Sequence, residues 1–224
     1  MKERGMIFNA EMVRALLDGR KTQTRRIVKG TDGAVKFCKE WDINGEEIFV
    51  VLGEKDRTGM NPVLGAISCP FGAVGDRIWV RETFQGPLFD YDLMDSYCKD
   101  PTPFEKPEFC VYKADGVPAP EFYDADDELH CCWRPSIHMP RWASRIQLEI
   151  TGVRVERLQS ITLGDICKEV GCGLYDFRPA TYGFQVWEEL WKSIYGAESW
   201  NANPWVWVIE FKRVEAEKSE GGAA

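Results

Sequence analysis

The stretch GRKTQTRR, from Gly19 to Arg26, combines residue types that could perform chemistry. Four of its eight residues are cationic (Arg20, Lys21, Arg25 and Arg26), although the chain has a net charge of −8. A threonine hydroxyl becomes an effective nucleophile when a neighbouring base takes its proton, and Lys21 could serve as that base for Thr24. An ordinary lysine has a pKa of about 10.4, so Lys21 would need desolvation or nearby cations to lose its proton near neutral pH.

A basic loop at the end of a helix is the alternative interpretation. The preceding segment predicts a helix between Asn9, a suitable N-cap, and Gly19, a suitable stop. Its apolar residues recur at helical spacing: Met12, Val13, Leu16 and Leu17. Cations near a helix C-terminus are favoured by the helix dipole, which explains Arg20 and Lys21 without any chemistry. The two later arginines lie beyond the last turn, so this explanation does not extend to them.

The acidity of the chain comes from one segment. Gln85 to His130 contains twelve acidic residues and three lysines, a net charge of −9, so the remainder sums to about +1. Within that remainder, 14–29 carries +5 and 134–157 carries +3. An anionic ligand such as RNA or a nucleotide is therefore compatible with the composition. The acidic segment also suggests a surface for a basic protein partner.

The rest of the chain predicts an α+β fold built around a small twisted barrel. We expect strands over 77–84, 145–158 and 205–214, and helices over 163–170 and 184–195. The long strand changes face at Thr151-Gly152, which is typical of a bulge. The predicted buried residues are Ile78, Val80 and Phe84 on a strand, whose face Glu82 shares, and Phe184, Trp187, Leu190, Trp191 and Ile194 on a helix.

Two segments interrupt this core. Residues 31–71 are rich in glycine and 85–135 in proline and aspartate, and each contains one plausible strand, at 46–52 and 109–113. We therefore predict one domain over 1–214 with insertions at about 31–71 and 85–135. The small polar residues of 215–224 predict a disordered tail.

Composition and cysteine spacing favour a cytoplasmic protein without a metal or cofactor. The charged, amphipathic start does not resemble a signal peptide, and no apolar run reaches the length of a membrane span. The eight cysteines then remain thiols in a reducing compartment. His130–Trp133, HCCW, lies near His138, but no Cys-x(2–4)-Cys pair lies in this part of the chain to support zinc, so ordinary thiols are favoured. His138 could be a general base or a hydrogen-bonded structural residue.

Four segments together resemble the ASCH superfamily, whose fold is similar to the PUA RNA-binding barrels. They are MIFNAEMVRALLDGRKTQTRRIV, GDRIWVRETF, IHMPRWASRIQLEIT and NPWVWVIEF, and the resemblance covers roughly half of the chain. Long members of this type are common among phage-encoded proteins. The GRKTQT motif is close to that of small bacterial ASCH amidohydrolases, which convert N4-acetylcytidine to cytidine. The two insertions have no counterpart in those enzymes.

The resemblance implies catalytic roles for Lys21 and Thr24, and for Glu169 on the helix after the long strand. Asp165, one turn away, is the alternative to Glu169. Lys21 and Thr24 would face opposite sides of a continuous strand, so a shared site requires a turn between them. The cationic and aromatic residues expected to hold a nucleoside or RNA are Arg20, Arg25, Arg26, Trp79, Arg81, Arg141, Trp142 and Trp205. A non-catalytic RNA or modified-nucleotide binding module and a ribonuclease remain alternatives.

Overall fold

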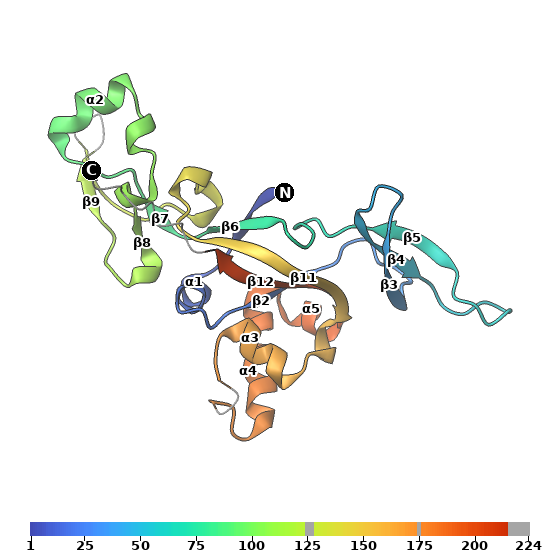
Figure 1. Cartoon of the computed structure of the whole chain (residues 1–224). Coiled ribbons are helices and arrows are strands. Elements are labelled where there is room, and N and C mark those ends of the chain that lie inside the picture. Colours follow the sequence, from blue (N-terminus) through green and yellow to red (C-terminus); the bar gives the residue numbers. More distant parts are fainter. Residues whose placement is uncertain (124–127, 174–175, 215–224) are drawn as a thin grey trace, which may run out of the picture.

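The computed structural model describes residues 1–123, 128–173 and 176–214, and it confirms the α+β class (Figure 1). The predicted disordered tail lies outside the described residues. The central sheet has the strand order β1-β6-β11-β12-β2. Its strands are β1 (Glu3–Ile7), β6 (Arg77–Arg81), β11 (Gln147–Arg157), β12 (Trp205–Val214) and β2 (Gln23–Ile27).

This sheet is open within the described part of the chain. β1 runs parallel to β6, the other neighbours are antiparallel, and β1 and β2 form the two edges. The edges nevertheless approach each other, because the Arg26 guanidinium of β2 donates to the Ile7 carbonyl oxygen of β1 at 3.0 Å. A side chain thus spans the edges that backbone pairing would join in a closed barrel. The predicted bulge is confirmed, since the β11–β12 register shifts between Ile150 and Gly152.

The helices begin and end where local capping residues place them. The main ones are α1 (Ala10–Leu17), α3 (Leu163–Val170), α4 (Ala180–Tyr195) and the short α5 (Ala197–Asn201). The Asn9 side chain accepts from the Met12 amide at 2.8 Å, and the Thr162 hydroxyl accepts from the Asp165 amide at 3.2 Å. Gly171 ends α3 with a φ of 83°, a conformation that glycine adopts without strain. None of the described helices is long and apolar enough to cross a membrane.

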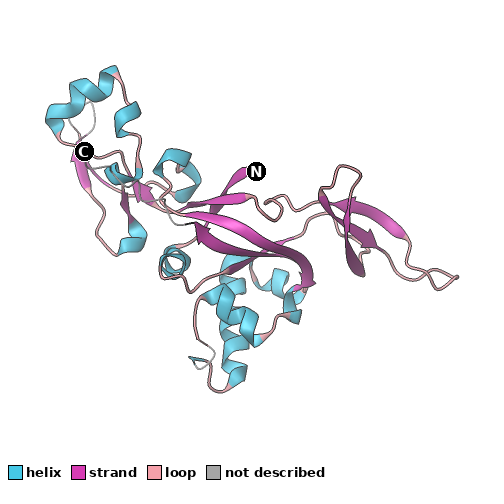
Figure 2. Cartoon of the chain, in the orientation of Figure 1, coloured by secondary structure: helices cyan, strands magenta, loops and turns pink. Residues whose placement is uncertain are grey.

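Two apolar cores cover the two faces of the sheet. α1 packs on one face with Ile78, Leu148 and Ile209 beneath it, and α3 and α4 pack on the other around Trp187 and Trp191. In Figure 2 the helices α3, α4 and α5 gather on one side of the magenta strands. The predicted stripe of the long helix is wrong at both ends. Phe184 and Ile194 are exposed, because the buried stripe of the helix runs along Gly183, Trp187 and Trp191 and these two residues lie beside it.

The first insertion forms an arm of three antiparallel strands rather than the single predicted strand. They are β3 (Lys36–Trp41), β4 (Glu47–Leu52) and β5 (Val63–Ile67). The predicted strand β4 alternates buried and half-buried residues. The strand β5, which was not predicted, is almost wholly exposed and shows no such alternation. Phe37 and Phe49 dock the arm edge-on against Trp205 and Trp207 of β12, with ring centroids 4.9 and 5.0 Å apart.

The second insertion projects from the other end of the sheet and mixes short strands with short helices (Figure 1). It contains β7 (Phe84–Gln85), α2 (Met94–Lys99), β8 (Val111–Tyr112), β9 (Glu121–Tyr123) and β10 (Leu129–Cys131). The predicted strand 77–84 is wrong at its end, because β6 stops at Arg81 and Phe84 pairs with Tyr112 instead. The predicted burial of Ile78, Val80 and Phe84 is confirmed, and Glu82 on the same face is buried as well, which was not predicted.

Candidate functional site

The GRKTQTRR stretch forms a turn followed by the edge strand β2. The amides of Arg20 and Lys21 both donate to the Ala15 carbonyl oxygen, at 2.8 and 3.0 Å, which closes the end of α1. The Thr22 amide then donates to the Lys168 carbonyl oxygen at 3.1 Å, joining the turn to α3. β2 starts only at Gln23. Lys21 therefore lies outside the strand, and the alternation of side chains along β2 does not decide which way Lys21 points.

Lys21 is fully buried, and its ammonium group has three acceptors. Nζ donates to the Gln23 carbonyl oxygen at 2.7 Å, to the Glu169 carbonyl oxygen at 2.5 Å and to Glu169 Oε1 at 3.4 Å. The side chains of Lys21 and Glu169 are 0% and 3% exposed. Burial lowers the pKa of Lys21 to about 8, and the positive charges of Arg26 and Arg25 act in the same direction. Glu169 opposes them but does not cancel the cost of desolvation.

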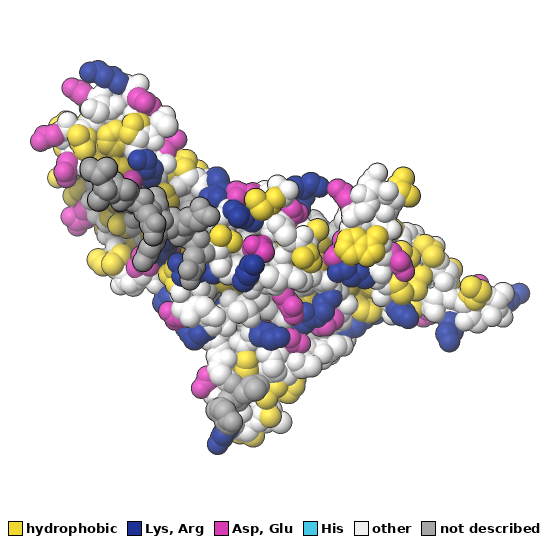
Figure 3. Space-filling view, viewed as in Figure 1, with side chains coloured by type: hydrophobic (Ala, Val, Ile, Leu, Met, Phe, Trp, Pro, Cys, Tyr) yellow, Lys and Arg dark blue, Asp and Glu magenta, His cyan; other side chains and the backbone are white. Residues whose placement is uncertain are grey.

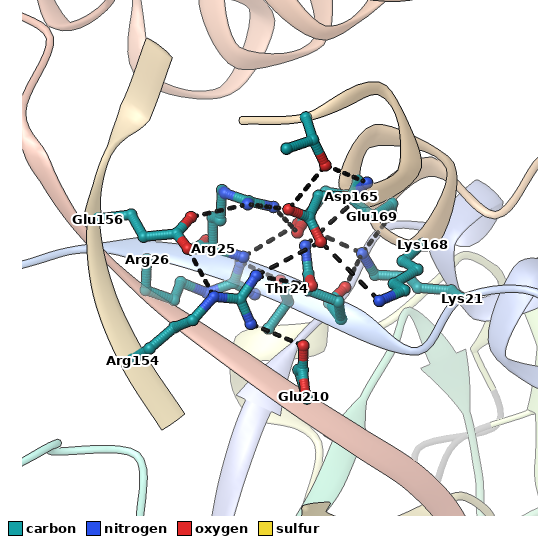
Figure 4. Close-up of polar contacts among 12 residues, drawn as sticks. Lys21, Thr24, Arg25, Arg26, Arg154, Glu156, Asp165, Lys168, Glu169 and Glu210 are labelled. Carbon is teal, nitrogen blue, oxygen red and sulfur yellow. Dashed lines mark hydrogen bonds and ion pairs between the residues drawn. The ribbon is translucent and has the colours of Figure 1, made fainter. Parts of the chain in front are cut away.

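Glu169 contacts two cations of the GRKTQTRR stretch, Lys21 and Arg25. Its Oε1 accepts from the Arg25 amide at 3.0 Å, and its Oε2 accepts from Arg25 Nη1 at 3.4 Å. Arg25 also lies 3.4 Å from Glu156 and 3.7 Å from Asp165, with its guanidinium over the Trp187 ring. Its Nε, buried with the rest of the side chain, has no hydrogen-bond partner among the described residues. The helix α3 thus supplies two carboxylates to one buried arginine (Figure 4).

Thr24 points to the opposite face of β2 from Arg25. Strand pairing places Thr24 beside Ile209 and Arg25 beside Val208, which belong to the two different cores. The Thr24 hydroxyl accepts from Arg26 Nη1 at 2.9 Å. Within the described residues it makes no hydrogen bond with Lys21. Lys21 Nζ and the Arg26 guanidinium both lie over the Phe8 ring, 6.0 and 5.5 Å from its centroid, so Phe8 is an aromatic neighbour of both cations.

The ion network reaches solvent through Arg154 of β11. Arg154 donates to Glu156 and to Glu210, both at 2.6 Å, and lies 3.4 Å from Asp165. Figure 4 shows these residues arranged across β11, β12 and α3. Sequence reasoning missed Arg154, Glu156 and Glu210. Arg154 and Glu156 alternate along a strand on the same face, and that spacing is the signal that could have found them.

Of the residues predicted to hold substrate, Arg25 and Arg26 lie beside Lys21 and Glu169, and the others do not form one surface with them. Arg20 pairs with Asp18 at 2.7 Å and also donates to the Gly171 carbonyl oxygen. Arg81 lies over Trp79 with its guanidinium 5.4 Å from a ring centroid, and Arg141 pairs with Glu3 at 3.0 Å. Trp79, Arg81 and Arg141 lie around β1 and β6, whereas Arg20 lies at the end of α1.

Two predicted tryptophans serve packing. Trp142 packs against the small core of the second insertion, around Phe84 and Met139. Trp205 packs on Phe37, donates from its ring nitrogen to the Ala34 carbonyl oxygen at 3.1 Å, and lies under Arg157. Trp205 therefore fastens the first insertion to the sheet.

The cysteine and histidine residues do not assemble a metal centre in the described part of the chain. All eight cysteines are free, and no group of three or more His, Cys, Asp or Glu side chains there could hold a metal ion. His130 stacks on Phe122 with ring centroids 5.5 Å apart. His138 closes a short helical turn at Ser136–His138.

Comparison of the chain with protein-family models, with curated proteins and with solved structures gives no match.

Proposed function

We propose that the chain is an amide hydrolase of ASCH type, with a PUA-like fold, that removes the acetyl group from an N4-acetylcytidine-like nucleoside. The observation that carries the proposal is the buried contact between Lys21 and Glu169. The two residues are 148 positions apart in the sequence, and Nζ and Oε1 are 3.4 Å apart in space. A lysine with a lowered pKa that is held by a specific carboxylate is the kind of group that active sites use as a base.

In the proposed reaction Thr24 is the nucleophile and Lys21 transfers the proton. The neutral amine of Lys21 takes the hydroxyl proton while Thr24 Oγ1 bonds to the acetyl carbonyl carbon. For this step Lys21 Nζ releases one of its present acceptors, and its lone pair accepts from the Thr24 hydroxyl instead. The C–N bond then breaks, and the cytidine amino group leaves with the proton from Lys21. Water hydrolyses the acetyl ester, which releases acetate and restores Thr24.

Arg26 has two roles in this scheme. Its Nη1, 2.9 Å from Thr24 Oγ1, is near enough to stabilise the negative charge of the tetrahedral intermediate. Its Nη2 bridges to Ile7 across the edges of the open sheet. Lys21 and Thr24 are both buried, so the substrate enters by displacing this bridge.

The test is turnover of N4-acetylcytidine to cytidine by the purified full chain, followed by chromatography. We expect Lys21→Met to reduce kcat by about a thousandfold, the range of one general base. Lys168→Met, a change at an exposed lysine on the same helix as Glu169, is the matched control and should retain the wild-type rate. Thr24→Val should abolish turnover, whereas Thr24→Ser, which keeps a hydroxyl, should retain part of it.

Wild-type protein that produces no cytidine, or a Lys21→Met variant with the wild-type rate, overturns the proposal. Thermal unfolding of each variant separates a lost reaction from a lost fold.

A non-catalytic module for RNA or a modified nucleotide is the second candidate, and the arrangement of β6 favours it. Arg77, Trp79 and Arg81 alternate on the side of β6 opposite the core, and Arg141 lies at the neighbouring strand β1. Cations interleaved with an aromatic ring suit a stacked base and its phosphate. In that case, single-stranded RNA should bind with a salt-dependent affinity that Arg81→Ala weakens and Lys21→Met leaves unchanged.

A further inference from the structure

The second insertion carries a groove between its two halves. A cavity of about 490 Å³ lies between the segment 87–97, which includes the first part of α2, and the strand β9. Its walls are mainly aromatic: Phe89, Tyr91, Tyr97, Phe122 and Tyr123. Tyr91 and Tyr123 are 68% and 59% exposed, which is unusual for large aromatic side chains without a partner.

A small aromatic cluster gives this groove a firm floor. Phe89 contacts Tyr97 and Phe104 with ring centroids 4.8 and 4.7 Å apart, and Phe104 contacts Phe109 at 5.5 Å. Phe104 is buried, so the cluster is a packed unit rather than a loose loop. The exposed rings therefore rest on a fixed support.

The rim of the groove is negatively charged. Asp90 and Glu121 line the cavity, and Asp92 and Asp95 lie on the adjoining turn and helix. None of these four carboxylates makes an ion pair with any of the residues that the structure describes. In Figure 3 hydrophobic side chains gather on the second insertion, with Asp and Glu side chains around them.

We propose that this groove binds a basic peptide segment of a partner protein. Arginine and lysine side chains combine a positive charge with a flat or aliphatic part that stacks on aromatic rings, and the groove offers carboxylates beside such rings. RNA and anionic lipid are unsuited, since the free carboxylates repel phosphate groups. The site is independent of Lys21 and of the proposed hydrolysis.

The experiment measures fluorescence anisotropy of a labelled peptide of alternating arginine and serine, titrated with the full chain at low and at physiological salt. Asp90→Asn with Glu121→Gln should weaken binding about tenfold, the combined effect of two exposed ion pairs. The matched control is Glu40→Gln with Glu189→Gln, which removes the same charge from exposed positions outside the insertion. It should change the affinity less than about twofold.

A second pair of variants tests the aromatic walls. Tyr91→Ala should weaken peptide binding about fivefold through loss of the ring–cation contact, and the exposed Trp41→Ala of the first insertion should not. Equal losses in the two charge variants, an affinity insensitive to Tyr91→Ala, displacement of the peptide by single-stranded RNA, or no binding at low salt would each overturn the proposal. Circular dichroism checks that every variant is folded.

Discussion

Arg145 and Lys21 are both cations that the fold withdraws from water, but the two are paired very differently. Arg145 donates twice to Glu82, at 3.0 and 3.1 Å, and twice to Asp115, at 2.9 and 2.6 Å. Its guanidinium also lies 3.9 Å from the centroid of the Tyr112 ring. Lys21 shares one carboxylate with Arg25, and each of these side-chain contacts with Glu169 is 3.4 Å long.

The protonation equilibria follow this difference in pairing. Burial opposes the charge of Arg145, but its hydrogen bonds to Glu82 and Asp115 outweigh it, so the pKa of Arg145 is raised. Burial of Lys21 is not outweighed, and its pKa falls to about 8. A cation with complete, short, two-pronged contacts is fixed in one state and serves stability. A cation with incomplete compensation can exchange its proton near neutral pH and is the better candidate for chemistry.

The largest expected effect is the loss of stability when Arg145 is replaced. Arg145→Ala should lower the free energy of unfolding by about 3–5 kcal/mol, because the Glu82 carboxylate, 2% exposed, would stay buried without its partner. Urea denaturation followed by tryptophan fluorescence measures the loss. Arg145 links the end of β6 to the second insertion, so the loss should be accompanied by local unfolding there.

A second substitution checks the cause. Adding Glu82→Gln to Arg145→Ala should recover part of the stability, since a neutral amide costs less to bury than a carboxylate. If the double variant is no more stable than Arg145→Ala, the buried charge is not the source of the loss.

The next effect concerns the pH dependence of Lys21. Its pKa is about 8 in the folded protein and 10.5 when unperturbed, so between these pH values the unfolded chain binds a proton that the folded chain has released. The free energy of unfolding therefore rises with pH over this window, by about 3 kcal/mol for this group. Below pH 8 both states hold the proton and the contribution is flat.

Denaturation of the wild type and of Lys21→Met across this window isolates the contribution from that of other titrating groups. The stability difference between the two proteins should change in favour of the wild type as the pH rises. Lys168→Met should follow the wild-type curve. Parallel curves for the wild type and Lys21→Met would show that Lys21 titrates normally. The proposed difference in protonation between Lys21 and Arg145 would then be wrong.

Elements with a regular apolar period were predictable from the sequence, and those with polar buried residues were not. α1, α3 and the closing strand β12 follow from caps, glycine stops and alternation. β2 was not predicted as a strand because the residues it buries are Gln23, Thr24 and Arg25, which suggest a solvated loop in isolation. Carboxylates contributed by α3 and β11, distant in sequence, make the burial of Arg25 tolerable.

The same reason limits what the sequence could predict of the candidate site. The short motif pointed to Lys21, and the resemblance pointed to Glu169 with Asp165 as its alternative; the structure brings Lys21 and Glu169 together. The position of Arg25 could not be read from the motif, since its carboxylate partners come from three separate positions, Glu156, Asp165 and Glu169. Edge strand β1 was also missed, because its short, charged sequence has no repeating apolar pattern.

The smallest expected effect is at an exposed ion pair, which tests whether burial rather than pairing decides the comparison. Arg141 and Glu3 are 46% and 37% exposed and lie 3.0 Å apart. Arg141→Ala should lower the free energy of unfolding by less than about 1 kcal/mol, because water solvates the released carboxylate. Urea denaturation under the conditions used for Arg145→Ala measures both on one scale. A loss as large as that of Arg145→Ala would mean that ion pairing itself sets stability here, and the low exposure of Glu82 and Lys21 would then no longer distinguish their roles.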